Sequence, residues 1–397
     1  RGAGLLGSGT PALCIPCGSA LGATWNPQLI TELGKSLARE THARGSHVLL
    51  APTVNIHRTP LGGRNFECYS EDPFLTSRIA VGFVKGVQSG GVATTTKHFV
   101  ANDSEFERNT INSVVPERAL REIYLAPFEA VVKEAQAWGI MAAYNRIDGE
   151  YACENEKILN QILREEWGFD GVVVSDWFAT RSTTKSIEAG LDLEMPGPVS
   201  HYGEKIVEAV NSGELDEEIV NSSVHRLLLL LERTGAFEDP LQVPERELDN
   251  PDDKILVRKA AAESMVLLKN DGLLPIELKE TETIALIGPN AATAMIMGGG
   301  SAQLVPQYVV SPLESFKNRL PNNEVLYEPG TVSDRTSRPI ARRILTREDG
   351  EQGFLIEYFN GLNCEGTPVA TSSKPDGRLL HFETIEGVEN ISDFSFR

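Results

Sequence analysis

The strongest constraint on the fold is a strict alternation of strand-like and helical patterns along the first 235 residues. Short apolar or β-branched runs, typical of strands buried on both faces, alternate with segments whose apolar residues recur at helical spacing. Strands are expected at 47–54, 92–96, 140–143, 172–174 and 191–194. Helices are expected at 25–44, 75–88, 116–138, 154–167, 180–189, 204–211 and 217–233. This alternation predicts an α/β fold with a parallel sheet and crossover connections.

Composition suggests further divisions of the chain. Residues 1–235 form the predicted strand–helix domain, and 236–254, Pro-rich and acidic, have the character of a linker. A helix expected at 255–268 and a strand at 283–287 predict the first part of a second α/β domain over 255–350. Residues 351–397 predict the start of a β domain. Because the chain begins at Arg1 and stops inside a structured pattern, we expect both ends to be cut, which leaves any targeting segment open.

The charge balance excludes some partners. A net charge of −19 argues against nucleic acid, whose phosphates such a surface would repel. No run approaches the roughly 20 apolar residues of a membrane span. A neutral or cationic small molecule is the expected partner, and a homo-oligomer is left open. Three N-glycosylation tripeptides, at Asn102, Asn221 and Asn390, favour an extracellular location, with a cytoplasmic one as the alternative.

Polar and aromatic residues follow four of the expected strands directly. They are Asn55, Lys97-His98, Tyr144-Asn145 and Asp176-Trp177. On a barrel the carboxyl ends of all strands meet at one face, where active sites lie. These side chains are therefore expected to converge. For Asp176 alone, an N-cap of the following helix is an equally good interpretation.

Three kinds of chemistry fit such a set of residues. A metal site is disfavoured because Lys97-His98 and the nearby carboxylates do not form a ligand set with paired His or Cys spacing. A Schiff base on Lys97 is disfavoured because the neighbouring charges would keep the amine protonated. Hydrolysis of a glycoside needs a carboxylate nucleophile, an acid for the leaving oxygen, and groups that hold sugar hydroxyls. Asp176 fits the first role, nearby cations are expected to keep it ionised, and the acid is not evident.

Four ordered motifs resemble glycoside hydrolase family 3, in its β-glucosidase branch. They are Gly62-Gly63-Arg64-Asn65-Phe66-Glu67, Ser70-Glu71-Asp72-Pro73, Lys97-His98-Phe99 and Val174-Ser175-Asp176-Trp177. The resemblance covers nearly the whole chain. It implies a (β/α)8-like barrel, then an α/β sandwich domain, and a β-sandwich insert of the protective-antigen type that begins near Phe354. It implies no cofactor and no metal.

The resemblance also assigns roles to residues. Asp176 matches the nucleophile, Met141 and Trp177 match the walls of the first sugar subsite, and Arg1 matches the end of a further sugar-binding motif. The polar sugar ligands correspond to Arg64, Lys97, His98 and Tyr144. The acid/base, a Glu in this branch, is expected beyond Arg397. The His acid of the family's β-N-acetylglucosaminidases has no counterpart in residues 99–104.

The predicted function is therefore that of a retaining β-glucosidase. It would remove terminal glucose from β-glucosides and short β-gluco-oligosaccharides, as in cellulose or β-glucan breakdown. The alternatives are a related β-xylosidase and a non-catalytic sugar-binding fragment. Structural roles also stay open: Arg64 could pair with Glu67 or Glu71, His98 could be a satisfied buried imidazole, and Tyr144 could belong to the core. Glu105, Glu107 and Arg108 are expected in a solvated loop.

Overall fold

The computed structural model describes residues 9–240, 243–279, 282–332, 345–347, 349–374, 385–388 and 394–397. The chain divides into two compact units. The first comprises residues 1–282 and 294–323, and the second comprises 283–293 and 324–397. All the site residues discussed below belong to the first unit.

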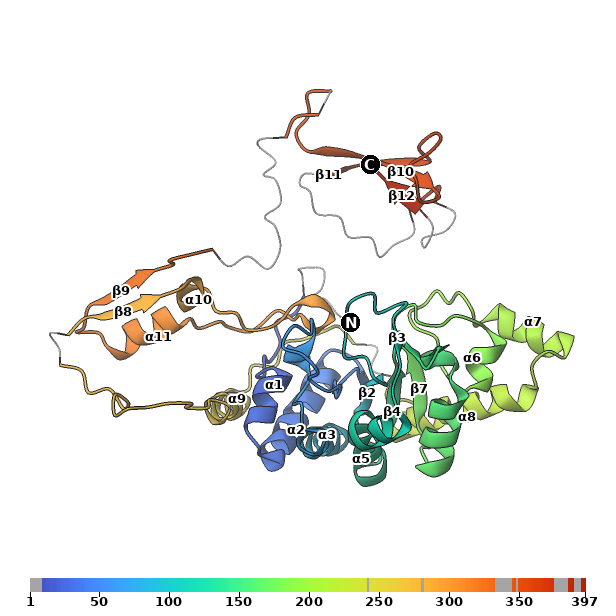
Figure 1. Ribbon diagram of the computed structural model, residues 1–397, viewed down its shortest axis with the longest axis horizontal. Helices are drawn as coiled ribbons and strands as arrows, with labels where there is room; N and C mark the ends of the chain where they lie inside the picture. Colours follow the sequence, from blue (N-terminus) through green and yellow to red (C-terminus); the bar gives the residue numbers. More distant parts are fainter. Residues whose placement is uncertain are drawn as a thin grey trace. The chain divides into compact units, whose positions relative to one another are not determined.

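A parallel sheet forms the centre of the first unit (Figure 1). Its strand order is β1 (Val48–Leu49), β2 (Ala93–Phe99), β4 (Gly139–Ala142) and β7 (Val172–Ser175). All three pairings are parallel, with Ile140 opposite Val173 and Met141 opposite Val174. The predicted α/β class is thus confirmed, since parallel neighbours require the crossover helices that the sequence pattern supplies.

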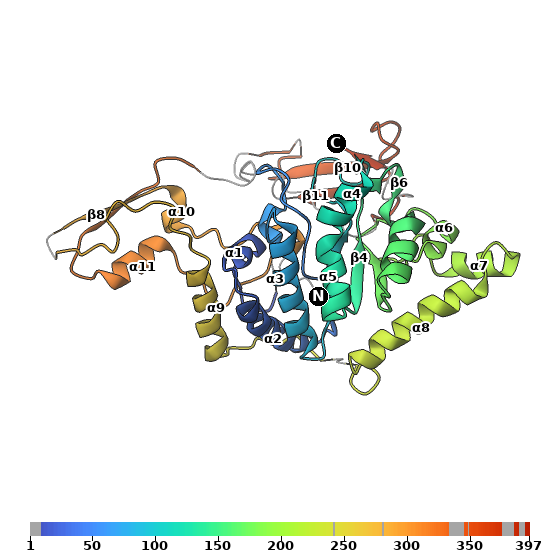
Figure 2. The same ribbon diagram turned by 60° about the horizontal axis from the view of Figure 1, so that its bottom comes forward.

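Three helices cover one face of this sheet (Figure 2). They are α2 (Pro27–Ala43), α3 (Pro73–Gln88) and α5 (Ala126–Ala135). Asp72 caps α3 by accepting hydrogen bonds from the amides of Phe74 and Leu75, and Pro73 occupies the first helical position. Ile140 and Val173 face this helical layer and are fully buried.

The opposite face of the sheet carries a separate apolar cluster. Met141, Val172 and Val174 form it, and Leu227 and Leu230 of helix α8 (Glu217–Arg233) pack against it. Successive side chains of a strand alternate between faces, so residue 176, two positions after Val174, projects on this side. The short helices of this unit include α1 (Gly18–Ala23), α6 (Thr184–Glu188) and α7 (Glu204–Ser212), and β3 (Asn112–Ser113), β5 (Arg146–Ile147) and β6 (Glu150–Tyr151) form a small sheet.

Several expected elements differ in detail. The helix expected at 116–138 is interrupted: α4 (Glu117–Ala119) leads into a π-helical turn, η3 (Leu120–Tyr124), before α5. The amide of Leu125 donates to the carbonyl of Leu120, five residues back, just before Pro127, which lacks an N–H and cannot continue an uninterrupted hydrogen-bond series.

Other boundaries shift. The strand expected at 47–54 is only β1 (Val48–Leu49), the strand expected at 92–96 extends to Phe99 in β2, and the helix expected at 180–189 is α6 (Thr184–Glu188). Residues 157–166 form a π-helix, η5 (Lys157–Glu166), and the strand expected at 191–194 is a single bridge between Leu193 and Val174. The helix expected at 255–268 is α9 (Pro251–Glu263), which starts earlier because Asn250 caps it. The first unit also contains η2 (Asn65–Glu67), η4 (Ala152–Glu154), η6 (Gly300–Ala302) and α11 (Pro312–Arg319).

The second unit contains two small sheets. β8 (Ile284–Ile287), which confirms the expected strand, pairs in parallel with β9 (Val325–Glu328), and α10 (Pro289–Ala292) follows β8. β10 (Phe354–Asn360) pairs antiparallel with β11 (Ala370–Lys374) and β12 (Phe394–Phe396). This is the β structure expected after residue 351; its origin as a protective-antigen insert stays a prediction.

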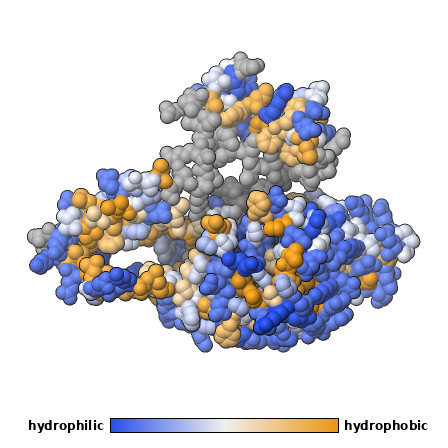
Figure 3. Space-filling model, viewed as in Figure 1, coloured by the Kyte–Doolittle hydropathy of each residue, from blue (hydrophilic) through white to orange (hydrophobic). Residues whose placement is uncertain are grey.

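The surface of the first unit is mainly polar. In the view of Figure 3, hydrophilic residues cover most of the area over α6, α7 and α8, in keeping with the net charge of −19. Among the described residues, no helix has the length and apolar character needed to traverse a bilayer.

Candidate active site

Asp176 lies where β7 ends, on the sheet face opposite the helical layer. The residue is 8% exposed. Its Oδ1 accepts a hydrogen bond of 2.7 Å from the amide of Trp177, so the carboxylate is oriented by its own backbone. Its Oδ2 is buried and makes no hydrogen bond of good geometry with any described residue. A buried carboxylate oxygen without such a partner is unusual in a folded protein and marks a candidate reactive atom.

His98 is the imidazole nearest to this oxygen. Its Nε2 lies 3.4 Å from Asp176 Oδ2 and 3.0 Å from Arg64 Nη1. The ring is held from the other side by Asn55, and His98 is only 2% exposed. The expected alternative of a buried imidazole with both nitrogens paired is therefore correct for the geometry. This pairing does not exclude His98 from the site, because the ring also lies 3.4 Å from Asp176 Oδ2.

Arg64 precedes η2 and is fixed by two acceptors. Its Nε and Nη2 donate to the two oxygens of Glu67, at 2.8 and 2.7 Å, while Nη1 donates to His98. The pairing of Arg64 with Glu67, left open by the sequence, is thus present, and Arg64 still faces the site. Burial by itself would lower the pKa of Arg64, but the hydrogen bonds and charge of Glu67 raise it overall.

Lys97 is the second cation of the site. Its Nζ makes no hydrogen bond to a described residue, but its charge interacts with those of Arg64, Glu67 and Asp176. Burial, and then the neighbouring Arg64, lower the pKa of Lys97. An amine placed between two carboxylates and lacking a fixed partner is suited to donate to a ligand hydroxyl.

The charge state of Asp176 reflects two opposing effects. Burial raises the pKa of the Asp176 carboxyl, whereas the Trp177 amide, Lys97 and Arg64 lower it in part. The expectation that nearby cations keep Asp176 ionised is met only in part, because burial raises the pKa of this carboxyl more than Lys97 and Arg64 lower it. The same cations, together with burial, hold the pKa of His98 well below its usual value, so His98 is neutral.

Tyr144 follows β4 and completes this group. It is 7% exposed, and its hydroxyl interacts with the Asp176 carboxylate and lowers the pKa of that acid. Burial and the Asp176 charge raise the pKa of Tyr144, so it stays a hydrogen-bond donor. The guanidinium of Arg108 lies over its ring, 4.7 Å from the centroid. Arg108 was expected in a solvated loop; the cation–π contact brings it to the site.

The remaining predicted residues divide into two groups. Trp177 packs on the apolar cluster that contains Met141, and their role as walls of a sugar subsite stays a prediction. Arg1 lies outside the described residues. The sequence had not selected Asn55, Glu67 or Arg108 as site residues, although Asn55 at a strand end and Glu67 three residues after Arg64 were both visible in it.

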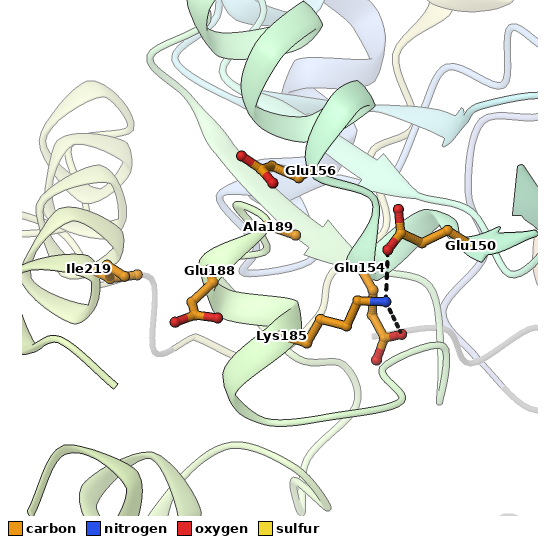
Figure 4. A pocket seen from close by; sticks show the side chains of 7 residues that line it. All are labelled: Glu150, Glu154, Glu156, Lys185, Glu188, Ala189 and Ile219. Atoms are coloured by element: carbon orange, nitrogen blue, oxygen red, sulfur yellow. Dashed lines mark ion pairs between the residues drawn. The ribbon is translucent and has the colours of Figure 1, made fainter. Parts of the chain in front are cut away.

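A hollow lies away from this group (Figure 4). It has a volume of about 410 Å³ and is lined by the carboxylates of Glu150, Glu154, Glu156 and Glu188. Lys185 bridges two of them, at 2.7 Å from Glu150 and 3.8 Å from Glu154. Within the described ranges, no group of three or more His, Cys, Asp or Glu residues is arranged to hold a metal ion.

Two family models match this chain. Residues 2–230 match the N-terminal domain of glycosyl hydrolase family 3, and residues 265–381 match its C-terminal domain. A β-glucosidase of Rhizobium radiobacter is 50% identical over 398 residues, which cover 100% of this chain and 47% of that protein. A probable β-glucosidase I of Aspergillus clavatus is 45% identical, over 94% of this chain and 43% of its own length. The chain thus spans about half the length of these relatives.

Solved structures give the same result. The β-glucosidase of Kluyveromyces marxianus in complex with glucose superimposes with a TM-score of 0.78 at 38% identity, over 93% of this chain and 46% of its own. β-Glucosidase 3B of Thermotoga neapolitana in complex with glucose has a TM-score of 0.73 at 42% identity, over 78% of this chain and 44% of its own. The barrel-like α/β fold of the first unit is thus shared with proteins of that name.

Proposed function

This chain belongs to glycosyl hydrolase family 3, and on that premise we propose that it supplies the nucleophile and the sugar-binding groups of a retaining β-glucosidase. The observation that carries the proposal is the buried Asp176 carboxylate, with one oxygen held by the Trp177 amide and the other without a hydrogen bond. Glucose-bound relatives with this fold support the choice of sugar.

In the proposed reaction, Asp176 Oδ2 attacks the anomeric carbon of a terminal β-linked glucose. The leaving oxygen departs with a proton from a general acid, and a covalent glycosyl-enzyme forms. Water then attacks the same carbon and releases Asp176 and glucose with the original configuration. The predicted position of the acid/base, after residue 397, stays a prediction.

The surrounding groups suit the binding of sugar hydroxyls. Arg64 and Lys97 provide cationic donors, Tyr144 provides a neutral donor, and Trp177 provides an aromatic wall beside the carboxylate. In glycoside hydrolysis, hydrogen bonds to the 2-hydroxyl of the sugar strengthen in the oxocarbenium-like transition state. Arg1 is retained as a predicted ligand on the resemblance alone.

The test is covalent labelling of the full-length protein by a 2-deoxy-2-fluoro-β-glucoside with a good leaving group. We expect the label on Asp176, and we expect Asp176→Asn to lose turnover by about 10⁴-fold or more with its fold intact. Asp170→Asn is the matched control, because Asp170 precedes the same strand and pairs with Arg233 on the surface. Label on another residue would refute the assignment. No label at all would favour the non-catalytic sugar-binding alternative.

We further propose β-glucosides and short β-gluco-oligosaccharides as substrates, in cellulose or β-glucan breakdown outside the cell. Comparing kcat/KM for aryl β-glucosides and β-xylosides tests the sugar, and a larger value for xylose would favour the β-xylosidase alternative. Extracellular location keeps only weak support: Asn102 is 6% exposed and its amide donates to Glu105, so a glycan there is incompatible with this fold. Asn221 is exposed, and Asn390 lies outside the described residues. Fractionation and deglycosylation of the native protein test this proposal.

A further inference from the structure

We propose that Asn55 is a positioning residue that keeps His98 in the tautomer whose Nε2 accepts a hydrogen bond from Arg64, beside Asp176. This inference rests on the proposed function of Asp176, but its first consequence, the tautomer of His98, can be measured without any turnover. Asn55 itself makes no contact with Asp176, so it acts through His98.

The contacts of Asn55 with His98 define the orientation of both side chains. Asn55 Oδ1 accepts from the His98 backbone amide at 2.9 Å, and Asn55 Nδ2 donates to the His98 backbone carbonyl at 3.0 Å. These two backbone partners settle which end of the Asn55 amide is oxygen. Asn55 Oδ1 also lies 3.3 Å from His98 Nδ1. Because Oδ1 can only accept, Nδ1 carries the proton.

Arg64 settles the other ring nitrogen. A guanidinium can only donate, and Arg64 Nη1 lies 3.0 Å from His98 Nε2, so Nε2 is an unprotonated acceptor. The proton on Nδ1, held by Asn55, thus leaves Nε2 available for Arg64. The three groups form one chain, in which Asn55 orients the imidazole and the imidazole orients Arg64.

The tautomer matters because Nε2 lies only 3.4 Å from Asp176 Oδ2. A proton added to Nε2 would lie in the direction that Arg64 Nη1 now faces, and the positive ring would attract the Asp176 carboxylate and reduce its nucleophilicity. It would also remove the acceptor that Arg64 Nη1 uses. An unprotonated Nε2 therefore preserves both the reactive oxygen and the placement of the cation beside it.

The charged groups facing His98 support the neutral ring. They are Arg64, Lys97 and Arg108, all cationic, and they oppose one anion, Asp176. Burial acts in the same direction, since a charged imidazolium 2% exposed would lose its hydration. A carboxylate in place of the Asn55 amide would reverse this balance, because it would stabilise a doubly protonated ring.

The experiment compares Asn55→Asp and Asn55→Ala in the full-length protein. The aspartate preserves the shape and the acceptor toward Nδ1 but adds a negative charge. Asn155→Asp is the matched control: Asn155 is also buried, at 6% exposure, and its Oδ1 accepts from the Ile158 amide away from this group. Two readouts are used. The first is the ring ¹⁵N shifts of His98, assigned by a His98→Gln difference spectrum, and the second is the pH dependence of inactivation by the fluoroglucoside.

In the wild type we expect a neutral ring protonated on Nδ1 throughout the pH range from about 5 to 8. In Asn55→Asp we expect protonation of Nε2 at the acidic end, and an inactivation rate reduced about tenfold or more near pH 5 but by less than about threefold near pH 8. The sign follows because the added charge raises the pKa of His98, and the imidazolium forms only below that pKa. Asn55→Ala should instead lose activity at every pH.

A merely structural role would give a different result. Equal losses at all pH values for both Asn55 variants, or a wild-type His98 protonated on Nε2, would overturn the proposal. If the wild-type protein is not labelled by the fluoroglucoside at all, the proposed function fails. The NMR measurement would then still decide whether Asn55 sets the tautomer.

Discussion

Replacing Asp192 by asparagine tests how the strand that carries Asp176 is held in place. The Asp192 side chain is fully buried and pairs with two arginines, 2.7 Å from Arg164 and 2.7 Å from Arg226. It also accepts a hydrogen bond of 2.8 Å from the amide of Val173, inside β7. Asp192 therefore connects η5, β7 and α8.

The expected effect follows from burial. An asparagine has nearly the same volume but no charge, so two guanidinium groups, 13% and 18% exposed, lose their counter-ion. Removing one partner of a buried ion pair destabilises a protein by about 3–5 kcal/mol. Asp170→Asn removes a bidentate pair with Arg233 from the same region, but Asp170 is 64% exposed. An exposed pair contributes about 0–1 kcal/mol.

Urea unfolding followed by tryptophan fluorescence separates the two variants. With a slope of about 2–3 kcal/mol per molar urea, Asp192→Asn should lower the midpoint by about 1–2 M and Asp170→Asn by less than about 0.5 M. The reasoning is wrong if the two variants shift the midpoint equally, because burial would then not determine the strength of these pairs. Full stability in Asp192→Asn would show that the arginines find other acceptors.

Two further predictions concern the loops around Asp176. Glu67→Gln should lower kcat/KM for an aryl β-glucoside by about tenfold or more, because one of the two charge-assisted hydrogen bonds to Arg64 is lost. An unchanged kcat/KM would mean that His98 alone holds Arg64 in place. Burial raises the pKa of Asp103 to about 6. The protonated Asp103 carboxyl therefore contributes stability that is fully present below the unfolded pKa of about 3.9, and this stability is lost as the pH rises through about 6. Asp103→Asn should therefore melt at the wild-type temperature near pH 4 and above it near pH 8, and the opposite order in a thermal scan would contradict the assigned environment.

Local patterns were sufficient for the elements and for the convergence of the site. The β-branched run of β7 and the alternation of its side chains predicted a buried strand with Asp176 at its end. Residues that directly follow strands of a parallel sheet necessarily lie at one edge. For that reason Tyr144 and Asp176 could be placed together before any distance was known; Lys97 and His98 were expected just after a strand and lie inside the last residues of β2, at the same edge.

Other features depended on contacts between distant segments. The interruption of the helix at 120–124 and the reduction of the 191–194 strand to one bridge arise from hydrogen bonding that propensity does not determine. Arg108 was expected in solvent because its neighbours in sequence are polar. Its position over Tyr144, from a different loop, is visible only in three dimensions.

The sequence by itself determined the α/β class, the family, and the set of residues that meet at the ends of the strands, because strand periodicity and motif order are local properties. Only the tertiary structure decided the chemical state of those residues. Burial, and partners that lie 34 and 43 positions away in the sequence, determine which nitrogen of His98 carries the proton and how Arg64 is divided between Glu67 and His98. Hydrogen-bond geometry and desolvation depend on the folded neighbourhood, and a linear pattern does not contain them.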